Sequence, residues 1–188
     1  MLKKLQRSKV FRDPIYGYIT VEYEIIARLI DTYEFQRLRR IRQLAGVSLV
    51  FQTAEHTRFT HSLGAYELAR LCLNNVEGLK DLLTEKESLI LLISALLHDI
   101  GHGPYSHAFE HVLKHSQEEM SCKLILGETE INKILSEYDG LAEDVVNVVR
   151  DCRWGRTVET FGEDVLFGVF YVVGVDGEHF ASLPDDKI

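Results

Sequence analysis

The chain has 188 residues, 46% of them hydrophobic and 27% charged, and carries a formal net charge of −8. This length suits one domain around a single buried core, and the composition excludes a disordered or fibrous protein. The longest apolar run, residues 89–97, is too short for a membrane helix, which needs roughly 20 residues.

The charge is unevenly distributed. Residues 1–70 carry 12 Lys and Arg against 7 Asp and Glu, whereas the remainder carries 9 against 22. A basic segment in an acidic protein predicts a local anion site and argues against a broad nucleic-acid surface. A solvated charged face is the alternative.

The first seventy-five residues predict a hairpin followed by helices. Residues 10–21 place Pro and Gly between β-branched and aromatic residues, which is typical of a short strand or hairpin. Apolar residues recur at helical spacing over 24–44, which predicts two helices, and a third helix is expected over 57–76.

The middle of the chain continues as helices. A capping box at 84–87 begins an apolar helix that ends at His98, before a stop formed by Gly101, Gly103 and Pro104. Further helices are predicted over 106–113, from a second capping box at 116–119, and over 130–138 and 142–150. The body is therefore expected to be mainly α.

The tail has a different character. Residues 165–175 are rich in Val and aromatic residues and contain two Gly, which is strand composition. We expect one domain over 1–152 and an atypical, strand-like tail over 153–188. No signal-peptide pattern follows the N-terminus, and Cys72, Cys122 and Cys152 form no CxxC pair. Both features predict reduced thiols in a cytoplasmic protein.

A cluster of histidines predicts a metal site. His98 and Asp99 close an apolar helix, and a bound cation would compensate a carboxylate buried there. Neighbouring helical residues diverge by about 100°, so a third ligand must come from another element, and His61 is the best candidate. Mixed imidazole and carboxylate ligands suit Mn, Fe, Zn, Ni or Co, and Mg less readily.

The chemistry expected of such a metal is to polarise a phosphoryl oxygen and to activate water. Arg58 precedes His61 by three residues, on the same helical face, so its guanidinium would point toward the metal and a phosphate. The alternatives are a structural His–Asp pair and, for His107, His111 and His115, a plain exposed helix face.

The motifs around these residues resemble those of the HD-domain phosphohydrolases, and in particular their deoxynucleoside triphosphate triphosphohydrolase branch. The resemblance runs from about Phe11 to Cys122 and lies in five segments: 13–17 (DPIYG), 35–39 (FQRLR), 43–44 (QL), 56–64 (HTRFTHSLG) and 98–107 (HDIGHGPYSH). It implies an HD-domain helical bundle, a homo-oligomer, and a nucleotide substrate hydrolysed to a deoxynucleoside and inorganic triphosphate.

The resemblance also implies residue roles by position. The metal ligands would be His61, His98 and Asp99. The nucleotide would be contacted by Gln43 and Arg58, and a phosphate by His107. The acid/base and positioning group would consist of His102, Glu110 and His115.

One part of the family pattern is missing. The family's fourth ligand is an Asp in a DxDRxDY-like helix downstream of the HD pair, and this sequence has no such motif. Asp164 and Asp176 are the available candidates, in the strand-like tail. This departure predicts a truncated or frameshifted coding sequence, with weak metal binding and slow turnover.

Two rival functions remain open at this point. The first is another HD phosphohydrolase activity, such as a phosphomonoesterase or a cyclic-nucleotide hydrolase. The second is a non-enzymatic descendant that binds a nucleotide or a partner chain, which the missing fourth ligand would favour.

Overall fold

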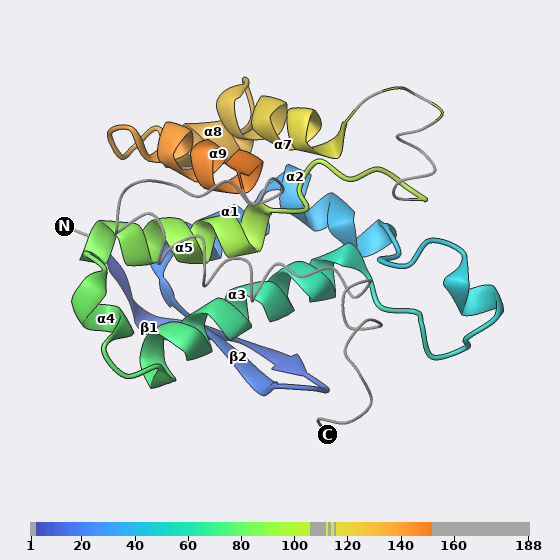
Figure 1. The fold of residues 1–188 in the computed structure, drawn as a ribbon, viewed down its shortest axis with the longest axis horizontal. Helices are drawn as coiled ribbons and strands as arrows, with labels where there is room; N and C mark the ends of the chain where they lie inside the picture. Colours follow the sequence, from blue (N-terminus) through green and yellow to red (C-terminus); the bar gives the residue numbers. More distant parts are fainter. Residues whose placement is uncertain (1–2, 106–111, 113, 115, 152–188) are drawn as a thin grey trace.

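A computed structural model describes residues 3–105, 112, 114 and 116–151 (Figure 1). The chain begins with an antiparallel hairpin of β1 (Lys4–Asp13) and β2 (Gly17–Tyr23), in which Val10 lies opposite Thr20. The Asp13 carboxylate accepts the N–H groups of Ile15 and Tyr16 at 2.8 and 3.0 Å and closes the turn. The predicted hairpin is confirmed.

The next segment covers the inner face of the hairpin. Helix α1 (Glu24–Asp31) buries an apolar face, and after a break at Thr32 the chain forms α2 (Tyr33–Gln36) and the 3-10 turn η1 (Arg37–Arg40). The sequence predicted helices as far as residue 44, but helical backbone ends at Arg40. The chain then runs extended, because residues 41–43 pair with 56–58 through a bridge between Arg42 and Thr57.

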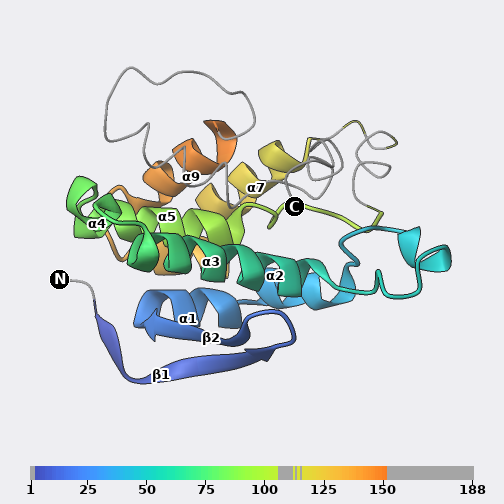
Figure 2. The same cartoon turned by 60° about the horizontal axis from the view of Figure 1, so that its bottom comes forward.

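Helices α3 (Arg58–Asn75) and α5 (Glu85–Leu97) lie side by side at the centre of the molecule (Figures 1 and 2). Each begins with a capping box, formed by Thr57 with Thr60 and by Thr84 with Glu87. The short helix α4 (Leu79–Leu82) between them was not predicted. Residues 89–97 of α5 are all buried, so this helix is the middle of the core.

A second layer packs on α5. It consists of α7 (Gln117–Leu126), α8 (Glu130–Leu135) and α9 (Leu141–Asp151), with Ser116 capping α7 (Figure 1). These helices confirm the helices predicted for this region and a mainly α HD-type fold, although α8 ends at Leu135 where the prediction extended to residue 138. Within the described part of the chain, no helix has the length and apolar character needed to cross a membrane. The helix predicted over 106–113, apart from residue 112, and the strand-like tail lie outside the described residues.

Candidate metal centre

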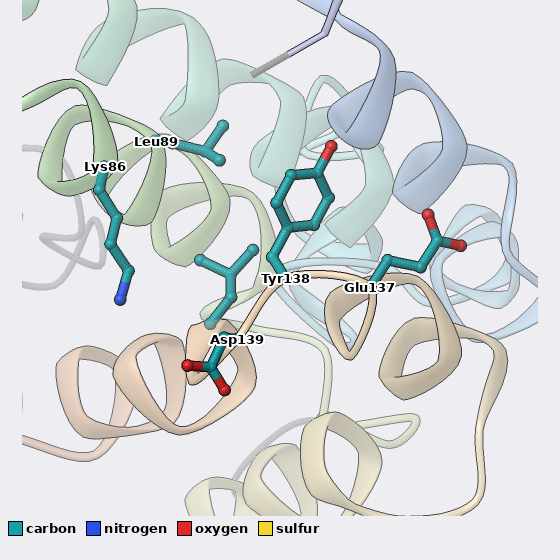
Figure 3. Close-up of a pocket in the computed structure, with 6 residues that line it drawn as sticks. Lys86, Leu89, Glu137, Tyr138 and Asp139 are labelled. Atoms are coloured by element: carbon teal, nitrogen blue, oxygen red, sulfur yellow. The ribbon is translucent and has the colours of Figure 1, made fainter. Parts of the chain in front are cut away.

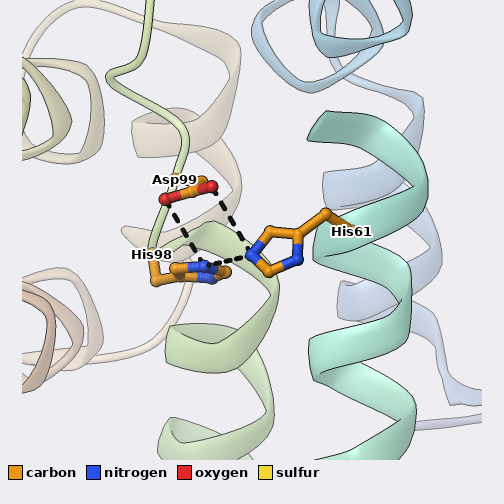
Figure 4. A group of neighbouring side chains, drawn as sticks. All are labelled: His61, His98 and Asp99. Carbon is orange, nitrogen blue, oxygen red and sulfur yellow. Dashed lines mark hydrogen bonds and ion pairs between the residues drawn. The ribbon is translucent and has the colours of Figure 1, made fainter. Parts of the chain in front are cut away.

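Three predicted ligands converge between the start of α3 and the end of α5. Figure 4 shows His61 pointing from α3 toward His98 and Asp99. Nε2 of His61 lies 3.1 Å from Nε2 of His98 and 3.6 Å from an Asp99 carboxylate oxygen, and Nε2 of His98 lies 3.4 Å from the other oxygen. Two ligand atoms bound to one ion can be at most about 4 Å apart, because each metal–ligand bond is about 2.1 Å long. The three side chains therefore fit one metal ion.

Both imidazoles can present a lone pair to this ion. Nδ1 of His98 lies 2.9 Å from the carbonyl oxygen of Ala95, so Nδ1 carries the proton and Nε2 carries the lone pair that a metal ligand needs. Burial, followed by the neighbouring His98, lowers the pKa of His61 to about 4. At neutral pH His61 is therefore uncharged, as a metal ligand must be.

The carboxylate of Asp99 is fully surrounded. Burial alone would raise its pKa, but His98, His102 and the positive charge of Arg58 together hold the pKa of Asp99 well below its usual range. The guanidinium of Arg58 donates directly to Oδ2 of Asp99, and both side chains are about 3% exposed. Nε2 of His102 lies 3.4 Å from Oδ1. Asp99 is thus ionised at neutral pH, as a metal ligand must be.

The structure brings two more predicted residues to the same region. His102 is buried against Asp99. Gln43 is buried, and its N–H donates to the carbonyl of His56 at 3.1 Å, beside the first turn of α3. Five other predicted residues lie outside the part of the chain that the structure describes: His107, Glu110, His115, Asp164 and Asp176.

One residue near the centre had no predicted role. Arg37, in η1, donates through Nη1 to the carbonyl of His102 at 2.8 Å and through Nη2 to the carbonyl of Ile100. Desolvation by burial lowers the pKa of Arg37. In the sequence, Arg37 lies in the 35–39 segment that contributes to the family resemblance. That segment did not predict which groups Arg37 contacts.

The turn after Asp99 packs directly on α7, and this contact requires glycine at residue 101. A Cβ atom there would lie 2.1 Å from the carbonyl oxygen of Gln117 and 2.5 Å from the amide nitrogen of Ser121. We expect Gly101→Ala to lower the free energy of unfolding by about 1–3 kcal/mol, since a backbone must shift to admit the methyl group. Chemical denaturation measures this.

Gly46→Ala is the matched control for this experiment. Gly46 is exposed, and an added Cβ would meet its nearest neighbour, the Leu49 side chain, at 3.9 Å. Its cost should stay within about 0.5 kcal/mol. Equal effects of the two substitutions would mean that the turn does not depend on its close approach to α7.

A separate cavity of about 350 Å³ opens between the start of α5 and the α8–α9 connection (Figure 3). Its charged lining residues are Lys86, Glu137 and Asp139, of which Lys86 pairs with Asp144 at 2.7 Å and Glu137 with Arg28 at 2.6 Å. Among the described residues, its lining includes none of the predicted ligands. The candidate site is therefore the metal centre and not this cavity.

Comparison with known proteins gives consistent relatives. The model of the family described as "HD domain" matches residues 58–154. The uncharacterized protein YwfO of Bacillus subtilis is 45% identical over 147 residues, which is 78% of this chain and 34% of that protein. Deoxynucleoside triphosphate triphosphohydrolase SAMHD1 of Gallus gallus is 33% identical over 169 residues, covering 83% of this chain and 27% of that protein.

Two solved structures are similar to this chain in fold and in sequence. A phosphohydrolase from Bacteroides thetaiotaomicron superposes with a TM-score of 0.67 at 31% identity, over 79% of this chain and 36% of that one. A hypothetical protein from Aquifex aeolicus gives a TM-score of 0.67 at 38% identity, over 87% of this chain and 42% of that one. The chain spans about a quarter to a third of the length of the two curated relatives named above.

Proposed function

The chain belongs to the HD-domain family, and we propose that it forms the metal-binding part of a phosphohydrolase that cleaves deoxynucleoside triphosphates to deoxynucleosides and inorganic triphosphate. The observation that carries this proposal is the convergence of His61, His98 and Asp99, whose ligand atoms all lie within 4.8 Å of one another. The similarity to relatives named as deoxynucleoside triphosphate triphosphohydrolases supports the substrate class.

His61, His98 and Asp99 would hold a divalent transition metal such as Mn, Fe, Zn, Ni or Co, with Mg a poorer fit to two imidazoles. When bound, such an ion supplies Lewis acidity to a phosphoryl oxygen and to water. The chain prepares this site, because Asp99 is held ionised and both imidazoles present Nε2 to the same point. Asp164 and Asp176 are the candidates that the sequence offers for a fourth protein ligand.

The neighbouring residues would handle the nucleotide. Arg58 lies beside the metal ligands, and a planar guanidinium matches the edge of a phosphate. Gln43, which pairs with His56 just before α3, would contact the nucleotide as well, and His107 would contact a phosphate. These roles follow from position in the family motifs.

Proton transfer and positioning would fall to a second group. His102 is buried against Asp99, which favours a role in orienting that carboxylate over direct contact with the substrate. Glu110 and His115 would then supply the acid and base. This division of labour is our proposal for the reaction.

We also propose three features of the whole protein. The HD domain would end near residue 152, which the family match over 58–154 supports. The protein would act in the cytoplasm, and it would assemble as a homo-oligomer, as the resemblance implies.

Product analysis tests the proposed function. The purified chain is loaded with each metal in turn and incubated with a panel of deoxynucleoside triphosphates. We expect a deoxynucleoside and inorganic triphosphate. Orthophosphate, or a linear product from a cyclic nucleotide, would assign a different HD activity. Binding of metal and nucleotide without turnover would assign a binding protein, the alternative favoured by the missing DxDRxDY-like motif.

A further inference from the structure

The main chain that follows Asp99 is held from two sides. On one side, the two carbonyls of Ile100 and His102 accept hydrogen bonds from the guanidinium of Arg37. On the other side, the N–H of Gly101 donates to Oγ of Ser121 in α7 at 2.9 Å. Three successive residues after the ligand therefore have a main-chain group fixed by a side chain from a distant part of the sequence.

This segment sets the orientation of two groups in the metal centre. It leads out of Asp99, and it carries His102, whose ring lies 3.4 Å from the Asp99 carboxylate. The N–H of His102 also donates to the main-chain carbonyl of Asp99 at 3.1 Å, which closes a tight turn. A rotation of the backbone at 100–102 would thus move His102 and release the carboxylate that it contacts.

The partners of Arg37 suit a guanidinium in particular. Its fork donates to two carbonyls that lie two residues apart, which a single ammonium could not span in the same way. Burial of a charge against neutral carbonyls is costly, and the lowered pKa of Arg37 reflects that cost. A purely packing role would be filled more cheaply by an apolar side chain of similar size.

We propose that Arg37 is a positioning residue of the metal centre, which fixes the Asp99 carboxylate and the His102 imidazole by holding the carbonyls of Ile100 and His102. Its consequence for turnover rests on the proposed function, whereas its effects on the backbone and on the metal do not. Outer partners of this kind are typically worth roughly 10- to 100-fold in metal affinity.

The test compares Arg37→Gln with Arg40→Gln in the full chain. Arg40 belongs to the same 3-10 turn but is exposed, so it is a matched control. In the metal-free protein, amide hydrogen exchange over residues 98–104 should become about tenfold faster or more in Arg37→Gln, and stay unchanged in the control. Exchange in the hairpin and in the middle of α5 should not change, which separates positioning from general destabilisation.

Cobalt(II) titration gives the second measurement. Arg37→Gln should lose roughly 10- to 100-fold in affinity, and Arg40→Gln should match the wild type. In Arg37→Ala, guanidinium ion at concentrations well below those that denature should restore both exchange protection and cobalt affinity. If these variants are unstable, Arg37→Lys, which keeps one donor, should show an intermediate loss of both.

These measurements test the positioning role of Arg37 independently of the proposed function. Wild-type exchange over 98–104 in Arg37→Gln would overturn it, as would faster exchange spread over the whole chain. A wild type that binds cobalt without hydrolysing nucleotides would refute the proposed function, while the two measurements still decide the role of Arg37. If the wild type binds no cobalt, the exchange measurement and its guanidinium rescue decide it alone.

Discussion

Replacing His98 with alanine should strip the metal from the chain, with a loss of affinity of roughly 100-fold or more. A ligand contributes more than the outer partners, whose loss already costs roughly 10- to 100-fold. His98 contacts both other ligands, at 3.1 Å from His61 and 3.4 Å from Asp99, so its removal leaves two donors that cannot complete a coordination shell. Elemental analysis of protein purified by gel filtration measures the loss.

His56→Ala provides the control for this experiment. His56 lies on an exposed stretch just before α3, and its main-chain carbonyl accepts the N–H of Gln43. It should keep the wild-type metal content, which excludes adventitious binding by surface histidines. An unchanged metal content in His98→Ala would place the ion elsewhere and remove the basis of the proposed function.

The parts of the fold that sequence patterns predicted are those with local causes. The capping box of Thr84 and Glu87 lies within one turn of α5, so four residues suffice to mark the start of that helix. The candidate metal ligands could be predicted in the same way, because the end of an apolar helix places His98 and Asp99 at the edge of the core. The prediction needed a third ligand from a second helix, and the structure brings His61 of α3 beside the pair.

The missed features depend on contacts between distant segments. The partners of Arg37 lie 63 and 65 residues along the chain, and no local pattern encodes that distance. The extended stretch at 41–43 arises from pairing with 56–58, which overrides its helical periodicity. Arg58 was expected to face a phosphate, but its contact with Asp99 depends on how α3 packs against the end of α5.

That contact predicts that Arg58 contributes strongly to stability. Arg58→Met should lower the free energy of unfolding of the metal-free protein by about 3–5 kcal/mol, because it leaves the Asp99 carboxylate buried without its cationic partner. Both side chains are about 3% exposed, so water cannot replace the lost guanidinium. Chemical denaturation in the presence of a chelator measures the effect.

Lys86→Met is the matched control, because it also breaks one ion pair with a methionine. Lys86 pairs with Asp144 at 2.7 Å, but the two side chains are 57% and 37% exposed. Such surface pairs contribute about 0–1 kcal/mol. Equal losses in Arg58→Met and Lys86→Met would show that the buried pair does not stabilise the fold.

Added metal and the variant Arg58→Lys distinguish the structural role of Arg58 from its role in binding phosphate. Added metal should stabilise Arg58→Met more than the wild type, because a cation bound to Asp99 compensates the charge that the guanidinium no longer balances.

Arg58→Lys keeps one positive charge, so it should lose less stability than Arg58→Met. Its nucleotide affinity, measured by calorimetry, should nevertheless fall sharply, since an ammonium cannot reproduce a bidentate contact to phosphate. Wild-type nucleotide binding in Arg58→Lys would leave Arg58 with the structural role alone.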